Sequence, residues 1–165
     1  MAVSHVPREH YPVRHRWGIA VGPGMIVGAV ATVGLVVSMF MSWRAGSVHP
    51  ADIPAAFLWD RDATSDPSLL IFLIPLAALL GIGSFIRGGA ALRLFAGFLA
   101  MVVVGLFAYQ LHELTDRLNV SFSDALDPGF YVAGIAAIAG FVSGFLPTTL
   151  AHHEVDNYAD DDVAA

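Results

Sequence analysis

Long apolar runs dominate the chain, and most charged residues stand between them. A helix that crosses a bilayer needs about 20 consecutive apolar residues. Four segments reach or approach this length without Asp, Glu, Lys, Arg or His: 18–41, 68–86, 94–111 and 129–147. The pattern predicts an all-α polytopic membrane protein, in which residues 18–147 form a bundle of four transmembrane helices with two outer loops.

The first apolar segment follows Arg14 and Arg16 and therefore has the flanking charge of a secretory signal peptide. Its apolar run is much longer than the 7–15 residues typical of such a peptide, and no clear A-x-A-like cleavage site follows it. We therefore interpret the segment as a retained transmembrane helix.

The composition agrees with a membrane protein. Of the 165 residues, 56% are hydrophobic and 13% charged, and the mean hydropathy is +0.68. Soluble domains carry about 25% charged residues, so the composition argues against an ordinary soluble enzyme and excludes a nucleic-acid-binding chain. The absence of cysteine excludes disulfides and thiol catalysis. All basic residues are Arg, which favours a GC-rich, bacterial genome.

The flanking arginines predict the orientation. Five of the eight precede the first segment or lie in the short connection 87–93, and three lie in the two outer loops. Basic residues favour the cytoplasmic side. We expect a multi-pass protein of the cell membrane with a cytoplasmic N-terminal tail (1–17) and an acidic cytoplasmic C-terminal tail (148–165), both disordered. Basic and aromatic side chains near the span ends are expected to anchor the chain at the membrane–water interface: Arg14, Arg16, Trp17, Trp43, Tyr109 and Tyr131.

Small residues mark two helix faces that are suited to close packing in lipid. They are Gly24 and Gly28 in the first segment, and Ala133, Ala136, Gly140 and Gly144 in the fourth. The favoured interpretation is contact between the first and fourth helices of the same chain, and the alternative is an interface with a partner subunit. Pro23 and Pro75 lie inside predicted helices and are expected to kink them.

The predicted spans hold no residue able to relay protons or to ligate a haem, which argues against a pump and against a haem protein. Asp60, Asp62 and Asp66 have the spacing of a partial calcium loop, but the central Gly and the final Glu are missing. We expect no metal, no cofactor and no enzymatic activity. An enzyme that uses the outer carboxylates on lipid is a weaker alternative.

The four spans with one long outer loop resemble the layout of tetraspan and claudin-like proteins. The resemblance is one of topology only. Trp43 and Trp59 stand too far apart for the W-x-x-W motif of claudins, and the paired cysteines are missing. No functional residue is carried over from these families.

The leading functional hypothesis is a non-catalytic accessory or assembly subunit of a larger membrane complex. It rests on the small-residue faces, the lack of reactive groups in the spans, and the apolar stretch 53–59, in which Phe57 and Trp59 are expected to contact a partner. Other membrane proteins, a second copy of the chain and the lipid bilayer are the expected partners. The alternative is a homo-oligomeric channel or permeability factor, with Pro23 and Pro75 as hinges and the outer acids attracting cations.

Overall fold

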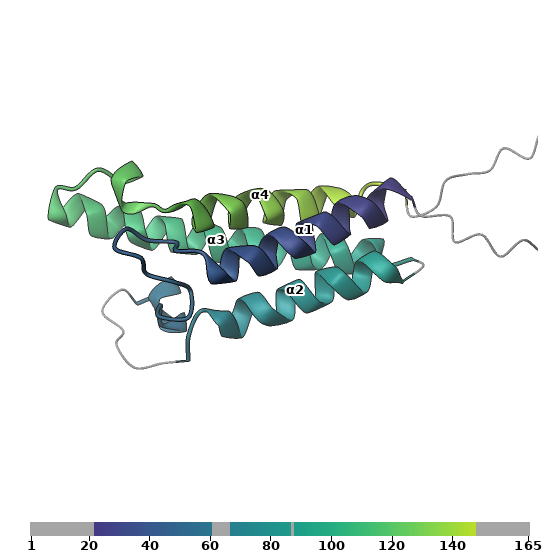
Figure 1. Ribbon diagram of the computed structural model, residues 1–165, viewed down its shortest axis with the longest axis horizontal. Coiled ribbons are helices and arrows are strands. Elements are labelled where there is room, and N and C mark those ends of the chain that lie inside the picture. The colour runs from purple at the N-terminus through teal and green to yellow at the C-terminus, as the bar shows by residue number, and fades with distance from the viewer. Residues whose placement is uncertain (1–21, 61–66, 87, 148–165) are drawn as a thin grey trace, which may run out of the picture.

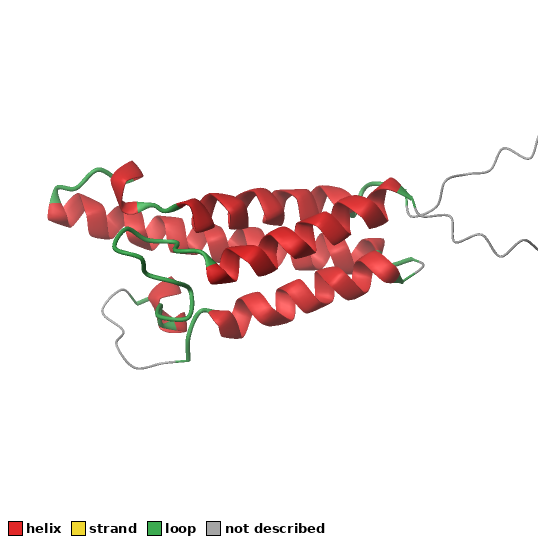
Figure 2. Cartoon of the chain, in the orientation of Figure 1, coloured by secondary structure: helices red, strands yellow, loops and turns green. Residues whose placement is uncertain are grey.

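The computed structural model describes residues 22–60, 67–86 and 88–147. Within these ranges the regular structure is helical, and extended segments form only isolated bridges such as that between Arg44 and Val48 (Figure 2). The all-α class is therefore confirmed. The elements are α1 (Pro23–Phe40), the 3-10 helix η1 (Ala55–Leu58), α2 (Leu70–Phe85), α3 (Ala90–Leu118), the 3-10 helix η2 (Ser123–Ala125) and α4 (Pro128–Ser143). The predicted tails, 1–17 and 148–165, lie outside the described residues.

The helix boundaries follow local backbone chemistry. Pro23 is the first residue of α1 and Pro128 the first residue of α4, a position where the missing N–H has no helical partner to lose. Pro23 therefore does not kink the helix from within, contrary to expectation, whereas Pro75 does lie inside α2. α3 ends at Leu118, and the left-handed backbone of the next residue, Asn119 (φ 53°), closes the last turn.

The four α-helices lie side by side and form a ring in chain order (Figure 1). α1 and α3 each pack on both α2 and α4. Main-chain hydrogen bonds join α1 and α4 near both of their ends. The Gly24 N–H donates to the Pro147 carbonyl at 3.1 Å, and the Gly129 N–H donates to the Ser42 carbonyl at 2.9 Å. α1 therefore begins where α4 ends, and α1 ends where α4 begins.

The helices differ in length. α1 and α3 are each long and apolar enough to cross a membrane, whereas α2 and α4 have 16 residues each and are shorter apolar helices. At about 1.5 Å per residue, 16 residues rise about 24 Å, less than the roughly 30 Å of a hydrocarbon core. Two candidate spans, and with them a membrane location, are thus supported by length and composition, and the predicted bounds 68–86 and 129–147 are wider than the helices.

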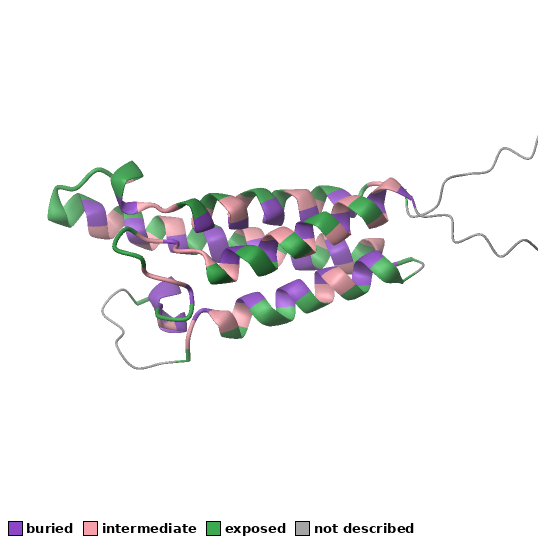
Figure 3. Cartoon of the chain, in the orientation of Figure 1, coloured by how far each residue is buried: buried purple, intermediate pink, exposed green. Residues whose placement is uncertain are grey.

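Every helix exposes large apolar side chains at its surface. Buried and exposed residues alternate along each helix (Figure 3), and the buried ones form the core between the helices. Buried residues include Leu35, Leu73, Ala100 and Phe107. Large exposed apolar side chains occur on all four helices: Ile26, Val30 and Val33 on α1; Ile71, Ile74 and Ile82 on α2; Phe95, Phe98 and Val102 on α3; Ile135, Ile138 and Val142 on α4. A soluble amphipathic bundle would carry polar residues at such positions.

Candidate docking surface

The two ends of the bundle are built differently, and we name each after its largest buried side chain. The Arg93 end contains the first turns of α1 and α3 and the last turns of α2 and α4. The Trp43 end contains the opposite helix ends and the loops between them. Both side chains have no exposed surface.

The small residues singled out in the sequence lie against other helices of the same chain. A Cβ added to Gly24 would lie 2.6 Å from the Leu146 carbonyl oxygen, and one added to Gly140 would lie 2.9 Å from the Leu80 side chain. Gly28 packs against Ser84 and Arg93, and Gly144 against Leu94. Ala133 and Ala136 are also buried. These faces are occupied inside the chain, so the site for a partner has to be sought elsewhere.

Arg93 is the buried charge that the sequence reasoning missed. The expected boundary of the third helix at residue 94 placed Arg93 in a connecting loop, but α3 begins at Ala90 and includes it. Its Nη1 donates to the Gly83 carbonyl at 2.8 Å, and its Nε and Nη2 donate to the Ser143 carbonyl at 3.2 and 3.1 Å. The apolar run 90–92 just before Arg93 was the available signal, because it extends the third segment towards the N-terminus.

Trp43 is a core residue and not an interfacial anchor as expected. Its indole Nε1 donates to the Ser38 carbonyl at 2.9 Å. The ring makes edge contacts with Phe107 on α3 and Phe130 on α4, with centroids 5.3 and 6.1 Å apart. The indole N–H therefore donates to a carbonyl at the end of α1 and not to water. The aromatic cluster fills this end of the bundle.

The remaining predicted contact residues differ in exposure. Phe57 lies in η1, is buried and packs on Phe107, so it supports the outer loop from within and offers little surface to a partner. Trp59 is 63% exposed. Tyr109 and Tyr131 are exposed near the Trp43 end, and the Tyr109 hydroxyl bonds to Glu113 at 2.7 Å. The other expected anchors, Arg14, Arg16 and Trp17, lie outside the described residues, as do Asp62 and Asp66 of the acidic loop.

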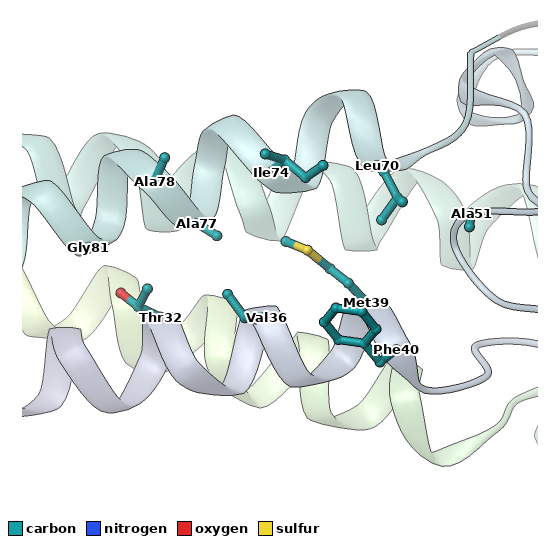
Figure 4. A pocket seen from close by; sticks show the side chains of 10 residues that line it. All are labelled: Thr32, Val36, Met39, Phe40, Ala51, Leu70, Ile74, Ala77, Ala78 and Gly81. Carbon is teal, nitrogen blue, oxygen red and sulfur yellow. The ribbon is translucent and has the colours of Figure 1, made fainter.

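Two lateral grooves flank α2. The first, of about 540 Å³, lies between α1 and α2. Figure 4 shows the Met39 side chain extending from α1 into this space towards Ala77 of α2, while Gly81 lies farther along α2, opposite Thr32. The one hydroxyl in its lining belongs to Thr32 and already donates to the Gly28 carbonyl at 2.8 Å. The groove therefore offers packing surface and no free donor to a ligand.

The second groove, of about 450 Å³, lies between α2 and α3. Trp59 stands at one of its ends with its ring 6.3 Å from that of Phe72, and Pro75 and Leu99 line its walls. Its lining residues are all apolar apart from the indole N–H of Trp59. Together the two grooves leave α2 incompletely covered on both sides, whereas α4, across the ring, meets its neighbours closely at glycine contacts.

The described residues contain no group of three or more His, Cys, Asp or Glu side chains placed to hold a metal ion. One acid–histidine pair, His112 Nδ1 and Asp116 Oδ1, lies 3.6 Å apart on the exposed extension of α3. The two grooves beside α2 are lined almost entirely by apolar side chains. Comparison of the chain with models of protein families, with curated proteins and with solved structures found no match.

Proposed function

We propose that the chain crosses the cell membrane four times and serves as a non-catalytic accessory subunit that binds a transmembrane helix of another membrane protein beside α2. The four-span arrangement is supported by the ring of exposed apolar side chains, which covers α2 and α4 as fully as α1 and α3. Apolar residues flank the shorter helices at 69, 86 and 144–147. These flanks lengthen the apolar stretch towards the thickness of a hydrocarbon core.

The distribution of charge supports the same arrangement. In the segments 23–40, 70–85, 90–110 and 128–143 the one charged residue is Arg93, and it is buried. The other charged residues of the described chain lie in the loops at the Trp43 end or on the extension of α3 beyond Gln110. With the arginine excess near the Arg93 end, the proposed orientation places this end and both tails in the cytoplasm.

The two grooves beside α2 are the observation on which the accessory role rests. Lipid is already apolar, so helices associate in a bilayer through close packing and not through the hydrophobic effect. A neighbouring helix that inserts side chains beside Ala77, Ala78 and Gly81 gains van der Waals contacts in the groove. Mobile acyl chains fill the same groove less completely. The lining bears no free polar group, so we propose an apolar helix face as the occupant.

Mild detergent extraction of the tagged chain at its native expression level tests the proposal. Native gel electrophoresis and mass spectrometry would follow the extraction. We expect a defined complex that contains a second membrane protein in fixed stoichiometry. A homogeneous small oligomer of this chain alone would contradict the accessory role and favour the channel alternative, for which conductance across a planar bilayer is the next measurement.

A matched pair of variants locates the docking surface. Ala78→Phe places a ring at the exposed rim of the first groove, and Ile138→Phe places the same ring on the exposed face of α4, outside both grooves. We expect Ala78→Phe to reduce recovery of the partner about tenfold, the size of effect seen at well-packed interface residues. Ile138→Phe should leave recovery unchanged. Equal recovery in both variants would remove the groove from the proposal.

A further inference from the structure

Arg93 is the one charged side chain that is completely buried among the described residues. The three hydrogen bonds that its guanidinium donates all end on main-chain carbonyl oxygens. Two of these bonds go to Ser143 and one goes to Gly83. The partners lie on different helices, so a single side chain joins α3 to the ends of both α2 and α4.

The accepting carbonyls belong to the last turns of α2 and α4. Carbonyls in a last turn lack the N–H partner four residues on that they would have inside a helix, and they carry the negative end of the helix dipole. The Ser143 carbonyl also accepts the Leu146 N–H at 3.3 Å. A cation placed between two such ends is stabilised without a carboxylate. Arg is suited to this role because its planar fork directs several N–H groups at fixed angles, so one side chain can reach both helices.

Glycines make the room that Arg93 needs. A Cβ added to Gly24 would lie 2.9 Å from Arg93 Nη2, and one added to Gly28 would lie 2.7 Å from Arg93 Cδ. A Cβ on Gly83 would come within 3.1 Å of Arg93 Cγ. The side chain is thus enclosed by the backbones of α1 and α2. A Cβ at Gly24 or Gly28 would overlap it, and a Cβ at Gly83 would contact it tightly.

We propose that Arg93 is a latch that closes this end of the bundle by holding the C-termini of α2 and α4 together. Two of its three hydrogen bonds exist only when α4 is in place, so α4 docking and burial of the charge occur together. Without the guanidinium, the end would open locally while the aromatic cluster around Trp43 keeps the other end closed. The latch is independent of whether a partner binds beside α2.

Buried serines at the two ends provide matched reporters in a chain that has no cysteine. Ser84 lies beside Gly28 at the Arg93 end and is 1% exposed, and Ser38 lies at the Trp43 end and is 0% exposed. Each hydroxyl donates to a carbonyl of its own helix at 2.7 Å, to Leu80 and Leu35 respectively. Ser84→Cys and Ser38→Cys therefore place one buried thiol at each end of the bundle.

The test measures the rate at which a bulky hydrophilic maleimide labels each single-cysteine chain, purified whole in mild detergent, with Arg93 or Met at position 93. We expect Arg93→Met to speed labelling of Ser84→Cys by about tenfold or more, as loss of charge-assisted hydrogen bonds raises the population of the open end. Labelling of Ser38→Cys should not change. An unchanged rate at Ser84→Cys, or an equal rise at both positions, would overturn the latch.

Arg93→Lys keeps the test decisive if Arg93→Met fails to fold. Lysine retains the charge but gathers its donors on one nitrogen and so bridges two helix ends less well. We expect Ser84→Cys to be labelled faster in Arg93→Lys than in the parent and more slowly than in Arg93→Met, again with no change at Ser38→Cys. Parent-like labelling of Ser84→Cys in Arg93→Lys would show that the forked geometry is not needed and would contradict the proposal.

Discussion

α4 and α2 occupy opposite positions in the ring, and they are packed in contrasting ways. Close backbone approach surrounds α4, where Gly97 of α3 meets the backbone of Phe141 and where Gly144 meets Leu94. α2 has a groove on each side, and its Gly81 has only the Thr32 side chain within reach. The small residues that face a neighbouring helix are therefore already packed within the chain. A helix flanked by grooves still has surface on which another helix can pack.

The largest expected effect on stability is the difference between replacing Trp43, which packs on α4, and replacing Trp59, which packs on α2. Trp43 packs on Phe130 of α4 and is fully buried, whereas Trp59 packs on Phe72 of α2 and is 63% exposed. Trp43→Ala should lower the free energy of unfolding by about 3–5 kcal/mol, as for other large buried side chains. Trp59→Ala should cost about 1 kcal/mol or less. Equilibrium unfolding in mixed detergent micelles measures both.

Equal losses in the two tryptophan variants would contradict the assignment of Trp43 to the core and of Trp59 to the groove. Trp43→Phe sharpens the result. It keeps the aromatic contacts but removes the indole donor to the Ser38 carbonyl. We expect a loss between those of the two alanine variants, since both packing volume and one buried hydrogen bond are reduced.

Two glycines give the next contrast. An added Cβ at Gly97 would overlap the backbone of Phe141, whereas one at Gly81 would sit in ordinary contact with Thr32 Cγ2 at 3.4 Å. Gly97→Ala should lower the free energy of unfolding by about 1–3 kcal/mol through overpacking. Gly81→Ala should leave it unchanged or raise it by up to about 1 kcal/mol, because alanine is the better helix former. The same unfolding measurement applies, and a destabilising Gly81→Ala would show that α2 is packed as tightly as α4.

The positions of the helices could be predicted from the sequence, but the side of each helix that is buried could not. Apolar runs placed all four, and Pro128 and the polar residues after Gln110 marked where α4 begins and where α3 leaves the apolar region. Because these helices are apolar all round, hydropathy alone does not say which side is buried. Outside these helices, Trp43 was expected at the membrane interface because it follows an apolar segment, and Phe57 was expected to contact a partner because it lies in an apolar loop stretch. Both side chains lie in the core.

The candidate site was harder to predict than the fold. The small residues identified helices that touch, but the grooves depend on how side chains such as Met39 and Leu99 fill the space between helices, which has no sequence signature. Arg93 was overlooked because a charge at a helix end is ordinarily a solvated flank. Its burial depends on glycines at 24, 28 and 83, which come from two other helices.

The central claim is that all four helices cross the membrane, and the sidedness of two exposed loop positions tests it most directly. Ala45 follows α1, and Ser121 follows α3. Single cysteines at these positions, in sealed vesicles, would be treated with a maleimide that does not cross the bilayer. Four spans place Ala45→Cys and Ser121→Cys on the same side, so both react or both are protected. If only α1 and α3 crossed, the two cysteines would lie on opposite sides, and one reacting without the other would contradict the account.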